Sequence, residues 1–266
     1  MTNKDLSKQF YSASPFPHLI IDNFLSINEL KKINKALRNF KKDNKSVISI
    51  NNSTTKKKII HKYLKSPKII NKIVDKISND GFIKYISKIC QLESKDVKSL
   101  KDFKMKYLPF RFFHEMDSGG YMGSHVDHSF IKNKVHFLNS ILYLSDTNSK
   151  TYSGSTNFYS KNGLNILKKI KAKKNRLVLF LHSSESFHGV SKIQSGSNKR
   201  YTIYMDYYIS QNKLYKLQQS FNRYRKGEKI KFWKHQTTFL PNSLFEFNRY
   251  IIFLKYLVKK YLKRIY

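Results

Sequence analysis

Cysteine is nearly absent from this sequence of 266 residues, and long apolar runs are missing altogether. The one cysteine, Cys90, cannot form a disulfide within the chain, so an oxidising compartment would bring it no stabilisation. No stretch approaches the roughly 18 uncharged apolar residues of a membrane-spanning helix. The opening residues also lack the apolar run of a secretory signal. These absences predict a cytoplasmic protein without a membrane span.

Acidic residues are scarce as well. The chain has 17 Asp and Glu against 52 Lys and Arg, which gives a net charge of +35. One interpretation is a densely negative partner, such as nucleic acid or an anionic membrane surface. The other is compositional drift, because Lys, Asn and Ile are abundant along the whole chain and the basic residues are scattered. The sequence leaves both interpretations open.

Aromatic residues are plentiful, with 18 Tyr and 20 Phe, so a core can be built mostly from rings together with Ile and Leu. The length allows a sizeable core and excludes a purely disordered tail. It suits one large domain with additions, or two small domains.

The first 100 residues combine one early strand with helices. The apolar run at 18–22 follows two prolines and predicts a strand. Ser26 and Glu29 have the spacing of a capping box, which predicts a helix to about residue 39. Ser66 followed by Pro67 predicts a second helix start, with Ser66 as the N-cap.

Residues 103–210 change character. Short segments rich in Tyr, Phe, Val and Ile alternate with Gly, Ser, Asn and Asp, which predicts many strands in a sandwich, jelly roll or barrel. Residues 211–266 form a basic, aromatic extension that ends in a predicted helix. Five apolar residues fall on one face of that helix, which favours packing on the β domain or contact with a membrane interface: Phe247, Ile251, Leu254, Val258 and Leu262.

A possible metal site begins with His125 and Asp127. On a strand, residues two positions apart point to the same side, so an imidazole and a carboxylate would converge. His188, on a later strand, supplies a third ligand. Two histidines and one carboxylate leave open positions and suit Fe(II), whereas a zinc hydrolase would also need a general base nearby. His128, directly after the pair, is expected to be structural.

Arg200 lies twelve positions after His188, at the start of another predicted strand. A guanidinium is a natural receptor for a carboxylate, which it can bind through two parallel hydrogen bonds. One hairpin from the metal, Arg200 could hold the far carboxylate of a five-carbon diacid. Alone, it could equally be a surface arginine of a very basic protein.

With these residues in place, the stretch from about 103 to 210 resembles the prolyl 4-hydroxylase-like branch of the 2-oxoglutarate/Fe(II) oxygenase superfamily. The likeness runs from a Gly-Gly turn and the His-x-Asp pair through SILYLSD, SGSTNFY, RLVLFLH and His188-Gly-Val to Arg200. The opening PFPHLIIDNFLSINEL is similar to the N-terminal strand and helix of that group. The resemblance implies a mixed α+β protein with a double-stranded β-helix (jelly roll) core, flanking N-terminal helices and a C-terminal helical extension.

The resemblance also implies an activity. Fe(II) would be the metal, 2-oxoglutarate and O2 the co-substrates, and succinate and CO2 the products, with ascorbate as a further candidate cofactor. The reaction would hydroxylate an unidentified substrate: a peptidyl proline, an amino acid, or a sugar or lipid precursor, with the basic composition favouring an anionic one. Ser140 and Tyr143 are candidates for lining the co-substrate pocket beside Arg200.

The chain is therefore expected to have an oxygenase domain at 1–210, with a helical part at 1–100 and a β core at 103–210. An extension at 211–266 is expected to pack on that core. The alternative function is a basic nucleic-acid-binding protein on an inactive jelly roll, since aromatic and basic residues interleave. An inactive relative would be expected to have lost a ligand, yet His125, Asp127, His188 and Arg200 are all present.

Overall fold

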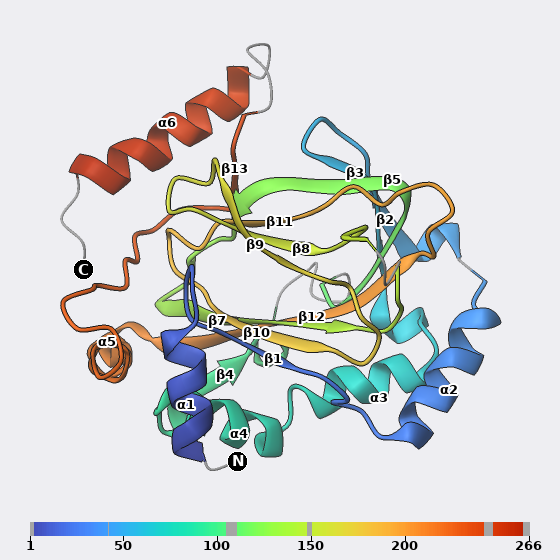
Figure 1. Cartoon of the computed structure of the whole chain (residues 1–266), viewed down its shortest axis with the longest axis horizontal. Coiled ribbons are helices and arrows are strands. Elements are labelled where there is room, and N and C mark those ends of the chain that lie inside the picture. Colours follow the sequence, from blue (N-terminus) through green and yellow to red (C-terminus); the bar gives the residue numbers. More distant parts are fainter. Residues whose placement is uncertain (1–2, 42, 105–110, 148–150, 242–246, 263–266) are drawn as a thin grey trace.

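The computed structural model describes residues 3–41, 43–104, 111–147, 151–241 and 247–262, arranged as a curled antiparallel sheet with helices outside it (Figure 1). The α-helices are α1 (Asn3–Ser12), α2 (Ile27–Arg38), α3 (Lys68–Lys76), α4 (Asp80–Cys90), α5 (Leu214–Asn222) and α6 (Phe247–Leu262). The strands are β1 (His18–Ile21), β2 (Val47–Ile50), β3 (Thr55–His61), β4 (Val97–Ser99), β5 (Phe113–Val126), β6 (Phe130–Ile131), β7 (Lys134–Tyr143), β8 (Thr156–Tyr159), β9 (Ile166–Ile170), β10 (Leu177–Leu181), β11 (His188–Val190), β12 (Arg200–Ser210) and β13 (Thr238–Phe239).

The main path of the sheet runs β1-β10-β7-β12-β5-β11-β8-β9, and every pairing among the described strands is antiparallel. The path folds back on itself, so that β1, β10, β7 and β12 form one layer and β5, β11, β8 and β9 the layer facing it (Figure 1). Helices α1 to α4 cover the outer face of the first layer. This arrangement confirms the predicted mixed fold with a jelly-roll core.

Strand β7 is buried on both of its faces. Leu138 and Leu142 point toward the helices and belong to the large apolar core there. Ile141 and Tyr143 point between the two layers and pack against Phe158. The alternation of a strand therefore divides its side chains between two cores, and only the inner set can reach a site between the layers.

Of the two helix starts predicted from capping residues, one is found in the structure and the other is not. The capping box is present as predicted: Ser26 Oγ accepts a hydrogen bond from Glu29 N, and Glu29 accepts one from Ser26 N, so α2 starts at Ile27. The prediction that Ser66 caps the next helix is wrong. Its hydroxyl donates to Lys62 O, the N-cap residue is Pro67, and α3 begins at Lys68.

The C-terminal extension returns to the sheet. Thr238 and Phe239 form β13 and pair with β5 at Val126 and His125. The predicted C-terminal helix is described as α6, from Phe247 to Leu262. None of the described helices is both long and apolar enough to cross a membrane.

Candidate metal centre

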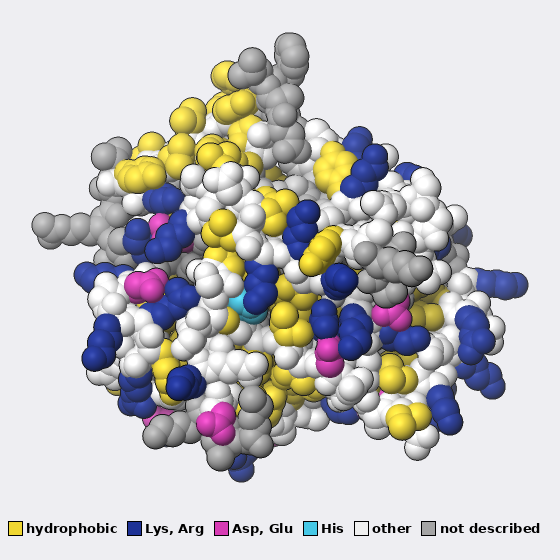
Figure 2. Space-filling view, viewed as in Figure 1, with side chains coloured by type: hydrophobic (Ala, Val, Ile, Leu, Met, Phe, Trp, Pro, Cys, Tyr) yellow, Lys and Arg dark blue, Asp and Glu magenta, His cyan; other side chains and the backbone are white. Residues whose placement is uncertain are grey.

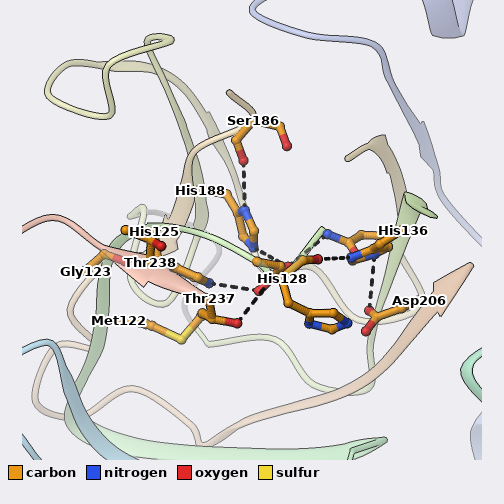
Figure 3. A network of polar contacts seen from close by, with 12 residues as sticks. Met122, Gly123, His125, His128, His136, Ser186, His188, Asp206, Thr237 and Thr238 are labelled. Atoms are coloured by element: carbon orange, nitrogen blue, oxygen red, sulfur yellow. Dashed lines mark hydrogen bonds and ion pairs between the residues drawn. The ribbon is translucent and has the colours of Figure 1, made fainter. Parts of the chain in front are cut away.

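Three predicted ligands converge between the two layers of the sheet. His125 lies near the end of β5, Asp127 follows that strand directly, and His188 opens β11, where it pairs in register with His125. The Nε2 atoms of His125 and His188 lie 3.6 Å and 3.4 Å from the two carboxylate oxygens of Asp127. Figure 3 shows the two imidazoles close together. These three residues offer ligand atoms that all lie within 4.8 Å of one another.

Both imidazoles turn Nδ1 to the backbone and Nε2 toward Asp127. His125 Nδ1 lies 3.0 Å from Gly123 O, and His188 Nδ1 lies 3.1 Å from Ser186 O. A carbonyl oxygen can only accept a hydrogen bond, so each Nδ1 carries a hydrogen, and Nε2 is the nitrogen of each ring that can bind a metal. Burial also lowers the pKa of His125 to about 3, which keeps that ring neutral.

Neighbouring side chains fix the orientation of these groups. The ring of Phe239, from β13, stacks on His125 at 4.7 Å between centroids. Asn139 Nδ2 donates to Asp127 Oδ2 over 3.1 Å. The ligands open on one side into a pocket of about 340 Å³. Two imidazole nitrogens, one carboxylate and an open side fit Fe(II) with positions left for other ligands.

Arg200 opens β12 and is buried, with 1% of its surface exposed. Its Nε donates to Gly154 O at 2.9 Å, and its terminal nitrogens donate to three hydroxyls: Thr156 Oγ1, Thr202 Oγ1 and Tyr204 OH. No carboxylate forms an ion pair with Arg200 in the part of the chain that the structure describes. A buried cation without an anion is costly, so this environment fits a carboxylate that arrives with a ligand.

The two parts of the site are joined through Tyr204. Its hydroxyl accepts from Arg200 over 3.0 Å, and its side chain lines the same pocket as the three ligands. Tyr143 lies beside Arg200, with its ring centroid 5.1 Å from the guanidinium carbon. Its hydroxyl shares a hydrogen bond with Thr156.

The structure does not bring Ser140 into this group. Ser140 Oγ donates to Met205 O at 3.3 Å and lies 3.5 Å from Tyr207 OH. Tyr207 in turn donates to Ile77 O, in the helical layer, so Ser140 faces away from the site. Its neighbour Asn139 takes the inward position and contacts Asp127 instead.

Several site residues were not predicted from the sequence. Thr202 and Tyr204 carried a usable signal, because residues two and four positions after Arg200 share its face of the strand. No sequence signal pointed to Lys58, which comes from β3. Its Nζ lies 3.6 Å from Met122 Sδ and 5.8 Å from the centre of the Tyr204 ring.

A second polar cluster adjoins the ligands (Figure 3). His136 Nδ1 donates to His128 O over 3.1 Å, and His136 Nε2 lies 3.8 Å from Asp206 Oδ1. His128 Nε2 is 2.8 Å from Tyr208 OH. His128 and Asp206 both line the pocket, so this cluster forms a polar part of its wall.

Comparison with known proteins gives a family and a fold. Residues 112–208 match the family model described as the 2OG-Fe(II) oxygenase superfamily. A search of curated proteins found no match. Among solved structures, a Pseudomonas putida prolyl-4-hydroxylase is similar at a TM-score of 0.52 and 14% identity, covering 77% of this chain and 98% of its own.

Two further structures share the fold. A Trichoplax adhaerens prolyl hydroxylase in complex with a hypoxia inducible factor peptide fragment matches at a TM-score of 0.52 and 17% identity, covering 79% of this chain and 91% of its own. The epimerase SnoN from nogalamycin biosynthesis matches at a TM-score of 0.50 and 8% identity, covering 78% of this chain and 83% of its own. The family match over the β core, on a jelly-roll fold, identifies residues 112–208 as a domain of the 2OG-Fe(II) oxygenase superfamily, whose enzymes use Fe(II) and 2-oxoglutarate.

Proposed function

We propose that His125, Asp127 and His188 hold Fe(II), that Arg200 binds the distal carboxylate of 2-oxoglutarate, and that the enzyme hydroxylates an anionic small-molecule or peptidyl substrate. The observation that carries this assignment is the pairing of two complementary sites. One offers two imidazole nitrogens and a carboxylate. The other is the buried guanidinium of Arg200, which donates to three hydroxyls and forms no ion pair with a carboxylate among the described residues.

The hydroxyls around Arg200 have hydrogens to give. Tyr204 OH and Thr202 Oγ1 both accept from the guanidinium, so their own hydrogens remain free to bind a carboxylate. The cation and these donors would hold a ligand carboxylate by charge-assisted hydrogen bonds. We infer that Tyr204 and Thr202 orient the co-substrate together with Arg200.

The protein's part in the chemistry is to position the reactants and to exclude water. When bound, Fe(II) and 2-oxoglutarate would together supply the reduction of O2 that oxidises a C–H bond, with succinate and CO2 as products. Phe239 and Phe180 pack against His125 and His188 respectively, at ring centroid distances of 4.7 Å and 4.9 Å. These rings keep the imidazoles in place and shield them from solvent.

Basic side chains at the pocket support an anionic substrate. Lys58, Arg111 and Arg249 line it, whereas its acidic lining consists of Asp206 and the ligand Asp127. Arg249 comes from α6, and its Nη2 donates to Asn52 Oδ1 over 3.3 Å. A pocket walled by cations raises the local concentration of an anion and steers it inward.

A paired substrate screen tests this function. Each neutral compound, such as a prolyl peptide, an amino acid or a sugar, is compared with its phosphorylated or carboxylated counterpart in the presence of Fe(II), 2-oxoglutarate and O2. We expect one succinate per hydroxylated product, with the anionic member of a pair preferred. Equal or better turnover of the neutral members would contradict the anionic substrate class. Absence of 2-oxoglutarate turnover with any substrate would contradict the oxygenase assignment.

A further inference from the structure

Helix α6 carries apolar side chains on two faces, and only one of them is packed. On the inner face, Phe253, Tyr256 and Leu257 join an apolar cluster with Phe187 and Trp233. Tyr256 OH also donates to Ser184 O over 2.5 Å. These contacts attach the helix to the β core.

The other face points away from the protein. Its side chains repeat every three or four positions and form one apolar stripe along the helix: Phe247, Ile251, Leu254, Val258 and Tyr261. Each of them is between 36% and 73% exposed. Figure 2 shows hydrophobic side chains gathered over the region that α6 occupies in Figure 1. A continuous exposed apolar surface of this kind marks a site of association.

The charge beside the stripe is of one sign. Helix α6 contains no acidic residue, and two of its four basic residues, Lys255 and Lys259, line the cleft beside it. The other two are engaged elsewhere: Arg249 lines the substrate pocket and Lys260 lies 3.7 Å from Glu185. A cleft of about 490 Å³ between α6 and the core is lined by Arg111, Lys234, Lys255 and Lys259, and none of its lining residues is acidic. An occupant of this surface therefore has to be apolar in one part and negatively charged in another.

These features select among possible occupants. A second copy of the chain would bring together two molecules of net charge +35, and their mutual repulsion opposes that association. A bilayer with anionic headgroups meets both requirements, since its acyl boundary accepts the stripe and its headgroups accept the lysines. Helix α6 has 16 residues, a length that suits a helix lying in the plane of the interface.

We propose that α6 docks this protein on anionic lipid membranes, with the apolar stripe inserted at the headgroup boundary and the basic side chains on the headgroups. The proposal depends on the exposed face of α6 alone and is independent of the assigned oxygenase chemistry. It also gives part of the large positive charge a function.

Vesicle co-sedimentation tests the proposal. The full-length protein is mixed with vesicles of phosphatidylcholine and phosphatidylglycerol, or of phosphatidylcholine alone, at physiological salt. The variant Leu254→Gln/Val258→Gln removes two stripe residues. The control Ile27→Gln/Leu64→Gln changes two apolar residues that are 71% and 60% exposed, one at the start of α2 and one shortly before α3. All four positions are exposed, so both variants are expected to fold, which circular dichroism checks.

The wild-type protein and the control should sediment with anionic vesicles, and the stripe variant should bind at least about tenfold more weakly. Three results would overturn the proposal: no sedimentation of the wild-type protein with anionic vesicles, equal binding to both vesicle types, or equal binding by the stripe variant and wild type. A wild-type dimer in light scattering that the stripe variant abolishes would also overturn it, because the stripe would then belong to a second copy.

Discussion

At the scale of single residues, the candidate site depends on hydrogen bonds that leave one atom of each group available. His125 and His188 use Nδ1 on backbone carbonyls and keep Nε2 for a metal. Tyr204 accepts from Arg200 and keeps its own hydrogen for a ligand. The sequence predicted the residues that carry charge or bind metal. It could not predict the partners that orient them, because Asn139 and Lys58 belong to no motif.

Replacing Arg200 with lysine should raise the KM for 2-oxoglutarate by roughly tenfold to a hundredfold, because an ammonium cannot reproduce the planar set of hydrogen bonds. The measurement is succinate formation as a function of 2-oxoglutarate concentration. Arg176→Lys is the matched control, since Arg176 pairs with Asp22 away from the pocket. An unchanged KM in the Arg200 variant would show that another residue binds the co-substrate.

At the scale of secondary structure elements, the sequence predicted an element well where it carries a local signal, such as a cap or an alternation of apolar and polar residues. The capping box defined the start of α2, and the short aromatic strands indicated the jelly roll. Strand β7 is buried on both faces, so its sequence has no contrast that shows which side chains point inward. The apolar face predicted on α6 is exposed, and a second apolar set on that helix packs on the core instead. On β7, the predicted Ser140 therefore faces the helices and its neighbour Asn139 faces the site.

Strand β1 provides a test by pH. Burial lowers the pKa of His18, in β1, from 6.5 to about 4. Between these values the unfolded chain binds a proton that the folded protein does not, so this residue destabilises the fold as pH falls from about 6.5 to 4. The variant His18→Gln lacks this titration. As pH falls from about 6.5 to 4, the wild type should therefore lose stability relative to the variant, and the difference in their unfolding midpoints should narrow. Thermal unfolding midpoints at several pH values measure the gap, and a constant gap would contradict this account.

At the scale of the whole molecule, the jelly roll and its C-terminal extension build the site together. The layers bring β5, β11 and β12 within reach of one another, and the extension adds Phe239 over His125 and Arg249 at the pocket. The family resemblance predicted the first contribution. The contribution of the C-terminal extension could not be predicted, because Thr238 and Phe239 form a strand only by pairing with β5, which is far away in the sequence.

The central claim is that His125, Asp127 and His188 bind Fe(II), and anaerobic calorimetric titration with Fe(II) tests it most directly. The matched pair of variants is Asp127→Ala and Asp117→Ala, since Asp117 is a carboxylate within β5 that contacts Lys199 and Ser118 N. We expect one Fe(II) to bind to wild type and to the Asp117 variant, and at least about tenfold weaker binding to the Asp127 variant. Equal Fe(II) affinity in all three proteins would contradict the account.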